Sequence, residues 1–335
     1  MRKKVGIIKV KNSFSDKIID YVDFNKYEVV TYNSYGNIDY NDLDSFDFFI
    51  WHFNPEDKER ALGLFTTMEL MEVKTFPDLK SLIFFDNKIF QSNLLKSLKI
   101  NIPSYKIYYD FRSLYKNLSK QIFPTVFKLK GGAGSNNVFL IKSKIHLLFK
   151  AFKMFTFGYN QVSRWNNLSN LIKKYFDGQV GLFKVFKGIV RLFVKTKRDR
   201  RLGKELGYFY LQEFLPNNKN DIRIIIIGDR CFAFTRYNRK NDFRASGSGN
   251  SSFSKDLIPK ELIKHSFEIY NKLGMISVAF DFLIKDSEYT LIEISYGFIK
   301  DLYENCEGYW TEDLKWNNED VRPELFIIET LFSEK

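Results

Sequence analysis

Cysteine and histidine are scarce in this chain, which has two cysteines and three histidines among 335 residues. The two cysteines, Cys231 and Cys306, cannot build the disulfide framework of a small secreted domain. So few thiol and imidazole ligands also exclude a zinc-finger type of site. We therefore expect a cytoplasmic protein whose thiols are reduced.

The sequence also lacks an apolar run of the ~20 residues that a membrane-spanning helix needs. Its N-terminus, MRKKVGIIKV, is basic but has neither the apolar stretch nor the small-residue cleavage site of a signal peptide. Neither GxxxxGKS nor GxxxxGKT occurs, so a P-loop nucleotide site is excluded.

Positive charge is concentrated in one segment. The formal net charge is +12, and residues 141–206 alone contain 16 lysines and arginines against 3 acidic residues. The rest of the chain is close to neutral, so an anionic partner should bind this basic insert. Nucleic acid is not the expected partner, because the basic residues do not alternate with an orderly array of stacking aromatics.

The first hundred residues alternate between strand and helix signals, which is typical of a parallel sheet with helices on its faces. Strands are predicted over residues 4–10, 27–32, 46–51 and 80–85, and helices over residues 54–72 and 87–98. We expect an N-terminal parallel α/β domain over residues 1–86.

The remaining sequence predicts antiparallel strand pairs with a few helices, an α+β pattern. The pairs are 124–130 with 138–141, 222–227 with 230–236, and 276–284 with 289–294; helices are predicted over 260–273 and 319–331. We expect two further lobes. The first covers residues 87–210 and contains the basic insert at about 142–206, and the second covers residues 211–335.

A lysine-bearing strand ends in a glycine-rich turn. Side chains alternate along residues 125–130, so Lys128 and Lys130 share one face. The turn that follows, GGAGS at residues 131–135, allows backbone N–H groups to approach phosphate oxygens closely. Such turns are also common as plain structural connections, so both interpretations stay open.

Two carboxylates, Asp281 and Glu293, each lie inside an apolar strand. The short turn between the two strands predicts that these side chains lie across from one another. A carboxylate flanked by Phe280 and Phe282 is unfavourable unless it is paired or binds a metal, and oxygen ligands in low number suit Mg²⁺. The alternative is that both carboxylates pair with lysine or arginine.

Three arginines, Arg223, Arg236 and Arg244, are predicted to converge on one sheet face. Convergence is unfavourable unless anions accept their forked donors, and phosphate or carboxylate would serve. The alternative is a set of solvated surface arginines.

Taken in order, six segments resemble the ATP-grasp superfamily, and within it the glutathione synthetase and ribosomal-protein glutamate ligase branch. They are FPDLKSLIFFDNK, PTVFKLKGGAGSNNVFLI, QEFLPNNKNDIRIIIIGDR, AFTRYNRKNDFRASGSG, VAFDFL and LIEIS. They lie within residues 75–141 and 208–298. A looser likeness links the chain to ATP-grasp proteins of surface-polysaccharide gene clusters. The resemblance implies an N-terminal α/β domain followed by two α+β lobes that clasp a nucleotide.

The resemblance also implies roles for individual residues. ATP would be bound by Lys88, Lys128, Gly131, Gly132, Gly134, Ser135, Glu213, Phe214 and Asp221, with Glu213 and Phe214 at the adenine. Two Mg²⁺ ions would be bound by Asp281, Glu293 and Ser295, and the catalytic residues would be Arg236 and Arg244. Ser295 and Ser246 stand where the family usually has asparagine, and Ser295 weakens the second metal site without abolishing it.

The implied activity is Mg-ATP-dependent joining of a small-molecule carboxylate to an amine through an acyl phosphate, in surface-polysaccharide or amino-sugar modification. A small-molecule kinase is one alternative, and a catalytically weak ATP-binding or membrane-docking module is another. His52 is a candidate base, although a lone histidine at a strand end is more often structural.

Two segments of the basic insert have helical periodicity. In residues 181–195, Lys184, Lys187, Arg191 and Lys195 form one stripe and apolar residues cover the rest, and residues 146–157 are similar. One interpretation is that these helices lie on an anionic membrane surface or hold a lipid-linked glycan, which would make the protein peripheral at the inner face of the membrane. The other is that they bury their apolar face in the protein's own core.

Overall fold

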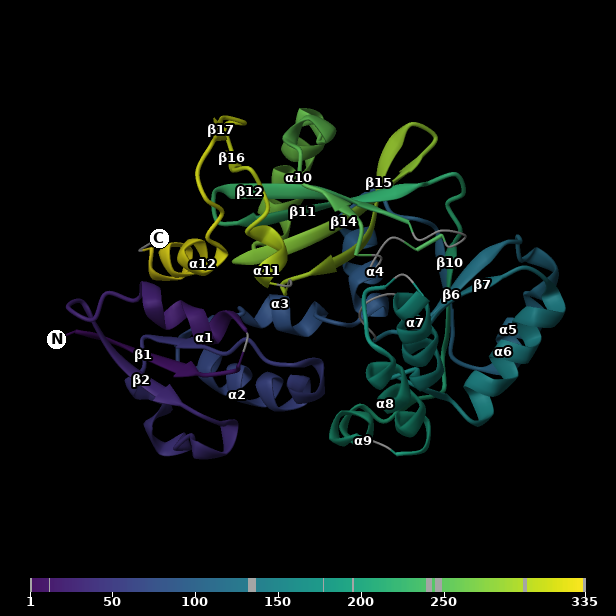
Figure 1. The fold of residues 1–335 in the computed structure, drawn as a ribbon, viewed down its shortest axis with the longest axis horizontal. Helices are drawn as coiled ribbons and strands as arrows, with labels where there is room; N and C mark the ends of the chain where they lie inside the picture. Colours follow the sequence, from purple (N-terminus) through teal and green to yellow (C-terminus); the bar gives the residue numbers. More distant parts are fainter. Residues whose placement is uncertain are drawn as a thin grey trace. The chain divides into compact units, whose positions relative to one another are not determined.

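The computed structural model describes residues 2–11, 13–131, 137–176, 178–194, 196–238, 243–244, 249–297 and 300–333. The chain divides into two compact units (Figure 1). Unit 1 consists of residues 1–102 and 217–335, and unit 2 consists of residues 103–216. The three domains expected from the sequence, with boundaries after residues 86 and 210, remain a proposal beside this division.

Unit 1 begins with the parallel sheet that the sequence predicts, with strand order β2-β1-β3-β4. The strands are β1 Lys3–Ile8, β2 Tyr27–Tyr32, β3 Phe48–Ile50 and β4 Lys74–Phe76. The helices that follow them in the chain are α1 Phe14–Ile18, α2 Lys58–Leu70 and α3 Leu79–Phe84. The mixed α/β and α+β class is therefore confirmed.

The strand predicted over residues 80–85 is wrong, because this segment forms the helix α3. The Asp78 carboxylate caps its first turn by accepting the N–H of Ser81 at 2.8 Å. The short apolar run of this segment fits a strand or a buried helix equally well, and the cap decides between them. The fourth strand, β4, lies just before the cap instead.

The larger sheet of unit 1 has strand order β15-β14-β11-β12-β16-β17, with β13 paired to β12. Its strands are β11 Asn220–Ile227, β12 Arg230–Tyr237, β13 Ser251–Ser252, β14 Ser277–Lys285, β15 Glu288–Ser295, β16 Tyr309–Thr311 and β17 Trp316–Asn317. Gly228-Asp229 forms the predicted two-residue hairpin turn, with Gly228 at φ +59°.

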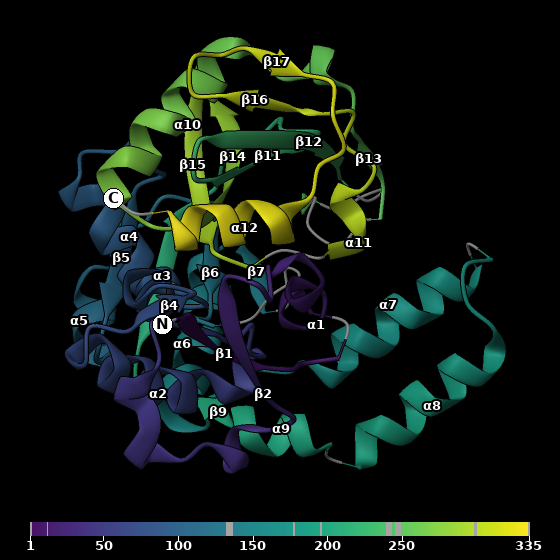
Figure 2. The same cartoon turned by 90° about the vertical axis from the view of Figure 1, so that its left-hand side faces the viewer.

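Each face of this sheet packs into a different core, since successive side chains on a strand point to opposite faces. Ile222, Ile224 and Ile226 pack with α10 (Lys260–Leu273) and α4 (Lys88–Ser97). Ile225 and Ile227 join the core that contains β1, β3 and the closing helix α12 (Pro323–Phe332). Figure 2 shows α10 and α12 beside the sheet.

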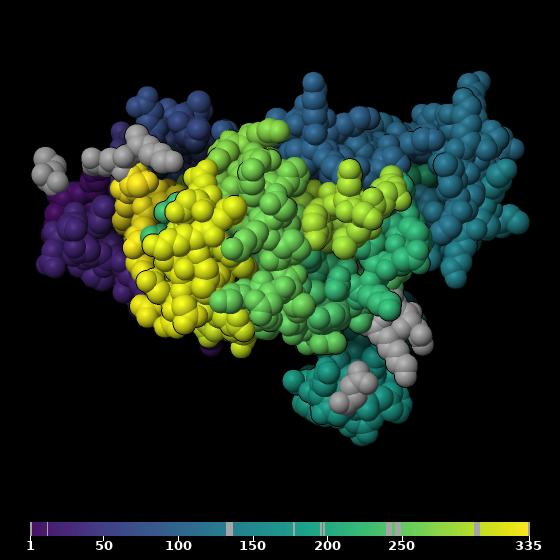
Figure 3. All heavy atoms as spheres, turned by 90° about the horizontal axis from the view of Figure 1, so that it is seen from above, coloured from purple at the N-terminus to yellow at the C-terminus, as the bar shows by residue number. Residues whose placement is uncertain are grey.

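The C-terminal segment follows α11 (Lys300–Tyr303) and lies against α10 in the space-filling view (Figure 3). Asn271 of α10 donates to the Glu312 carboxylate at 2.8 Å. Trp310 is 4% exposed in the α10 core, and its ring lies edge-on to Trp316 with centroids 4.6 Å apart. Trp310 therefore has a packing role.

Unit 2 contains an antiparallel sheet with strand order β5-β10-β6-β7. Its strands are β5 Tyr105–Tyr108, β6 Thr125–Lys128, β7 Val138–Ile141 and β10 Phe209–Glu213, and its first helices are α5 Phe111–Lys116 and α6 Lys144–Thr156. The insert adds α7 Arg164–Phe176, α8 Leu182–Phe193 and α9 Lys197–Leu202, with the short pair β8 Tyr159–Asn160 and β9 Lys204–Glu205. No helix among the described residues is both long and apolar enough to cross a bilayer.

Candidate functional site

Charged side chains gather at one end of the large sheet in unit 1. Asp221 and Arg223 lie on β11, Arg236 on β12, Asp281 on β14 and Glu293 on β15. Cross-strand partners are Asp221 with Arg236, Arg223 with Asp281, and Asp281 with Glu293. Directly opposite residues share a face, so neighbouring strands build one ionic cluster.

The cluster lies on the sheet face turned away from α10. Asp221 and Arg223 have the same parity along β11 as Ile225 and Ile227, which pack into the core with β1 and β3. One face of the strand is thus apolar at its carboxyl end and ionic at its amino end.

A β-bulge brings Glu293 into this cluster. From the turn at Asp286-Ser287 the pairing of β14 with β15 is regular up to Phe282 and Leu291. The register then shifts by one residue, so that Asp281 pairs with Glu293 and Ile292 is the additional residue. Without the bulge, Glu293 would lie on the α10 face.

Arg236 lies at the centre of the cluster. Its Nε is 2.6 Å from Asp221 Oδ1 and its Nη2 is 2.8 Å from Asp221 Oδ2, a two-pronged ion pair. The same Nη2 is 2.8 Å from Asp281 Oδ2. All three side chains are more than nine-tenths buried, so the two carboxylates depend on this guanidinium for neutralisation.

Two further cations complete the cluster. Arg223 Nη1 is 3.4 Å from Asp281 Oδ1, and Lys88 Nζ at the start of α4 is 3.3 Å from Glu293 Oε1. Lys88 is buried, whereas the Glu293 side chain is 34% exposed. The cluster therefore combines three carboxylates with three cations and is neutral as a whole.

The proton affinities follow from burial and from this pairing. Burial raises the pKa of Asp221 to about 6, with Asp281 adding to the rise and Arg236 opposing it. Burial works against the charge of Arg236, but Asp281 and Asp221 outweigh it and raise the pKa of the guanidinium. Arg236 consequently stays charged at any pH at which the protein folds.

The cluster decides part of what the sequence left open. Asp281 and Glu293 do lie across from one another, as predicted, and both are paired with basic side chains. The anions that Arg223 and Arg236 need are the protein's own aspartates. No group of three or more His, Cys, Asp or Glu positioned for a metal occurs among the described residues, so the magnesium assignment stays a prediction.

The structure describes the surroundings of the other predicted residues of unit 1, and of the glycine-rich turn, only in part. Ser295 Oγ donates to the Gly297 carbonyl at 3.0 Å and accepts the Gly297 N–H at 3.2 Å. The Arg244 guanidinium lies 6.0 Å from the centroid of the Phe243 ring. Gly132, Gly134, Ser135 and Ser246 lie outside the described residues.

Unit 2 carries the remaining predicted residues. Lys128 ends β6 opposite Tyr210 and is partly exposed. Gly131 is the first residue of the glycine-rich turn, and Glu213 and Phe214 stand at the end of β10. The Glu213 carboxylate accepts the N–H and the hydroxyl of Ser104 at 3.2 and 3.1 Å, which ties the end of β10 to the segment before β5.

Glu205 is a residue that the sequence reasoning missed. Its carboxylate accepts the backbone N–H groups of Lys130 and Gly131, each at 3.2 Å. It also accepts hydrogen bonds from Gln161 Nε2 at 2.6 Å and from the Tyr208 hydroxyl. At 3% exposure, Glu205 anchors the start of the glycine-rich turn. The only feature of the sequence that could have drawn attention to Glu205 is its position as an acidic residue at the end of the basic segment.

His52 has a structural role in unit 1. It follows β3, its Nδ1 accepts the Phe14 N–H at 3.2 Å, and its own N–H donates to Ser15 Oγ at 2.6 Å. The Phe14 and Tyr296 rings pack against the imidazole. Burial lowers the pKa of His52 to about 4, so the ring is neutral near pH 7.

We expect His52→Asn to change the pH dependence of stability. The folded-state pKa lies below the ordinary 6.5, so the neutral ring's contribution is complete above pH 6.5 and is lost as the pH falls toward 4. The stability advantage of the wild type over the variant should shrink by about 2 kcal/mol over that range, allowing for the partial exposure of His52. Urea unfolding at several pH values measures it. An advantage that does not change with pH would contradict the assignment.

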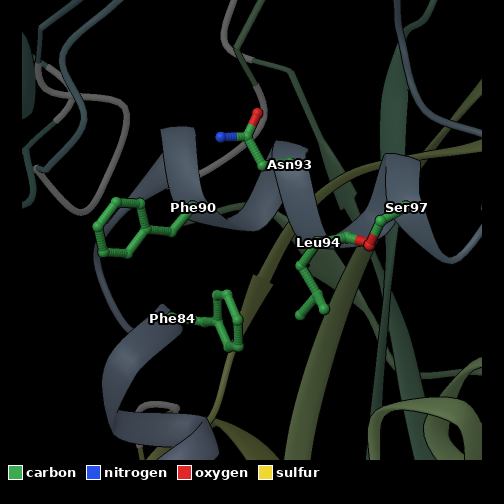
Figure 4. A pocket seen from close by; sticks show the side chains of 5 residues that line it. All are labelled: Phe84, Phe90, Asn93, Leu94 and Ser97. Carbon is green, nitrogen blue, oxygen red and sulfur yellow. The ribbon is translucent and has the colours of Figure 1, made fainter.

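A surface hollow in unit 1 is unrelated to the ionic cluster (Figure 4). It is lined by Phe84 of α3 and by Phe90, Asn93, Leu94 and Ser97 of α4. Lys88 lies on the side of α4 opposite to this hollow. In a helix of about 3.6 residues per turn, Phe90 and Ser97, which come two and nine residues after Lys88, point in nearly the opposite direction to it. The hollow therefore adds nothing to the candidate site.

Similar solved structures identify the architecture: the chain has the ATP-grasp fold. It is similar to the D-alanine–D-alanine ligase of Bacillus anthracis, at 16% identity and TM-score 0.54, over 88% of this chain and 86% of that one. It is also similar to the biotin carboxylase domain of the Hydrogenobacter thermophilus 2-oxoglutarate carboxylase, at 12% identity and TM-score 0.58, over 100% of this chain and 70% of that one. That structure contains MgADP, ADP and bicarbonate.

A third similar structure is an ATP-grasp protein with a RimK domain from Sphaerobacter thermophilus, at 10% identity and TM-score 0.50, over 87% of this chain and 90% of that one. The ATP-grasp fold that the sequence resemblance implied is thus confirmed. No family model matches the sequence, and no curated protein matches it.

Proposed function

We propose that the protein is a Mg-ATP-dependent ligase that joins a small-molecule carboxylate to an amine. The observation that carries this proposal is the pairing of Asp281 with Glu293 on adjacent strands of an ATP-grasp fold. Three basic side chains, Arg236, Arg223 and Lys88, lie next to these carboxylates.

The cluster fits magnesium by its donor chemistry. Mg²⁺ in proteins takes one or two carboxylates and completes its shell with water and substrate phosphates. Glu293 suits this role best, because its side chain is partly exposed. Asp281, on the opposite strand, is the second ligand, and Ser295 lies two residues beyond Glu293 on the same face.

The cluster also fits an anion. Arg223 Nε is buried without a hydrogen-bond partner among the described residues, so a phosphate or carboxylate oxygen would satisfy it. Since the cluster is neutral, it supplies no excess positive charge for a nucleotide. Lys88, Lys128, Arg244 and the N–H groups of residues 131–135 are the donors that we assign to the phosphates, with Glu213 and Phe214 at the adenine and Asp221 on the ribose side.

Each residue then has a defined task. Bound Mg-ATP would supply the phosphoryl group that turns a carboxylate into an acyl phosphate, which an amine can attack. Arg236 is fixed by Asp221 and Asp281, so its main task is to hold Asp281 in place. Arg223 and Arg244 are the arginines that could meet the reacting carboxylate, as donors that stabilise developing negative charge.

We further propose that the substrates belong to surface-polysaccharide or amino-sugar modification, at the inner face of a membrane. The resemblance to ATP-grasp proteins of polysaccharide gene clusters and the basic insert support this proposal. A ligase acting there needs a small-molecule carboxylate and an amine, one of which can be carried on a lipid-linked glycan.

Hydroxylamine trapping tests the reaction class. With Mg-ATP, a panel of amino acids and uronic acids, and hydroxylamine, a ligase forms ADP together with a hydroxamate. A kinase would form ADP with a stable phosphorylated product, and a binding module would form no ADP. Either of these last two results would refute the ligase.

Asp281→Asn should reduce ADP formation by at least a hundredfold, because it removes a metal ligand. Glu293→Gln should raise the Mg²⁺ concentration needed for half-maximal activity. Because the Glu293 side chain is partly exposed, this substitution should disturb folding less than Asp281→Asn does. Asp286→Asn is the matched control, since Asp286 is exposed in the turn of the same hairpin. Normal turnover by folded Asp281→Asn protein would remove the metal assignment.

A further inference from the structure

The helices α7 and α8 pack side by side as a hairpin within the basic insert (Figure 2). Gly188 of α8 marks their close approach, because a Cβ there would lie 2.9 Å from Leu171 Cδ1 and 3.0 Å from Leu168 Cδ1. Arg164 at the start of α7 donates to the carbonyl of Leu192 near the end of α8. The two helices therefore form a braced element.

Only a narrow stripe of α8 is covered by α7. Val185 and Gly188 are buried, and Leu192, one turn further on, is partly buried. These positions are three and four residues apart, which defines one helix face. The sequence left open whether the apolar residues of the insert enter the protein's core, and for most of α8 they do not.

A second face of α8 is apolar and exposed. It consists of Leu182, Phe183, Phe186, Ile189, Val190 and Phe193, and Phe183 and Phe193 are 69% and 82% exposed. On α7, Trp165, Ile172 and Phe176 are exposed as well. Large apolar side chains clustered in this way are unusual on the surface of a monomer and mark a binding surface.

The third face of α8 is basic. Lys184, Lys187 and Arg191 are exposed and follow one another at intervals of three and four residues. Lys187 Nζ lies 4.8 Å from the centroid of the Phe183 ring, so positive charge borders the apolar face directly. Neither α7 nor α8 contains an acidic residue, and α7 adds Lys173 and Lys174 in its last turn.

We propose that the α7–α8 hairpin docks on an anionic lipid bilayer. The exposed phenylalanines would enter the boundary between headgroups and acyl chains, and the lysines and arginine would meet anionic headgroups. An apolar face bordered by basic residues, without acidic ones, matches that surface in both chemistry and charge. The inference deepens the peripheral location proposed above and does not depend on the ligase reaction.

Two other occupants would have different signatures. A second copy of the chain would bury the apolar face, but six basic side chains on each hairpin would repel one another. Nucleic acid would use the basic face and leave the phenylalanines in water. The bilayer is the partner that uses both faces.

Flotation with lipid vesicles tests the inference on the full chain. Vesicles of phosphatidylcholine with about one-third phosphatidylglycerol should carry the protein upward, and pure phosphatidylcholine vesicles should carry far less. Raising the salt from 0.1 to 1 M should weaken the binding, because the Debye length falls from about 10 to about 3 Å. Equal binding to both vesicles, or none, would overturn the proposal.

Two variants separate the two faces. Replacing Phe183, Phe186 and Phe193 by serine should abolish flotation. Replacing Lys184, Lys187 and Arg191 by glutamine should weaken binding to anionic vesicles about a hundredfold, since each basic residue near such a surface contributes about fivefold. Lys260→Gln, Lys264→Gln and Lys272→Gln together are the matched control, because they remove three exposed lysines from α10.

Two further measurements distinguish membrane docking from self-association and from a general loss of activity. Sedimentation should show no change of oligomeric state in the serine variant, and a dimer that dissociates only in that variant would overturn the proposal in favour of self-association. Hydroxamate formation from soluble substrates should be unchanged in all three variants. Loss of flotation with intact turnover would support docking, whereas intact flotation in both hairpin variants would refute it whatever the turnover.

Discussion

Arg236→Gln should lower the free energy of unfolding by about 3–5 kcal/mol, the usual effect of removing one partner of a buried ion pair. The guanidinium makes contacts of 2.6 and 2.8 Å with Asp221 and of 2.8 Å with Asp281. Without it, two buried carboxylates would face each other with Arg223 as the nearest remaining cation. Chemical denaturation monitored by tryptophan fluorescence measures the change.

The control is Arg322→Gln, which removes an exposed arginine with a 3.3 Å contact to Asp320 and should have an effect below about 1 kcal/mol. Asp221→Asn added to Arg236→Gln should restore part of the loss, because it removes one of the stranded charges. If Arg236→Gln alone were as stable as the wild type, the cluster would not contribute to holding the sheet together.

Glu205→Gln should destabilise unit 2 and weaken nucleotide binding. Four donors converge on the Glu205 carboxylate: two backbone N–H groups, an amide and a hydroxyl. An amide at this position accepts through one oxygen only and turns an NH₂ group toward the remaining donors, so buried donors stay unsatisfied. We expect a loss of about 2–4 kcal/mol, from one or two such groups.

The kinetic result distinguishes anchoring of the glycine-rich turn from general stability. If residues 131–135 bind phosphates, Glu205→Gln should raise KM for ATP by at least tenfold and change kcat less, and amide exchange at Lys130 and Gly131 should become faster. Glu307→Gln, an exposed substitution of the same chemistry, should change neither. An unchanged KM in protein that remains folded would separate Glu205 from the nucleotide site.

Elements encoded by local signals could be predicted from the sequence. The Gly228-Asp229 turn fixed the β11–β12 hairpin, and with it the pairing of Asp221 with Arg236. The helix over residues 260–273 follows from its apolar spacing. α3 was mispredicted because the apolar run after Asp78 is too short to show a period.

The position of Glu293 shows where such reasoning stops. The sequence placed it across from Asp281 because a short turn joins their strands, but a regular hairpin would have opposed Asp281 to Ile292. The bulge supplies the difference, and no local residue pattern announces it. The pairing of β11 with β14 is equally hidden, since α10 separates these strands in the chain.

Contacts between distant segments were the least accessible part of the site. Lys88 was assigned to phosphate, and the structure brings it to Glu293. Glu205 could not be recognised because three of its four hydrogen-bond partners lie 44 to 75 positions away in sequence. For α8, periodicity predicted the helix but not which apolar residues stay exposed, since that depends on the narrow contact with α7.

The discontinuous make-up of unit 1 has a consequence for the order of events during synthesis. Residues 103–216 are a complete unit when residue 216 has left the ribosome, so they can fold while the rest is still being made. The β1–β4 sheet is made before unit 2, but it is covered only after unit 2: the rings of Tyr27 and Phe48 pack on Phe332 of α12, each with centroids 4.4 Å apart. Until α12 has been made, this apolar surface of the β1–β4 sheet stays uncovered, and a chaperone would find its binding surface there.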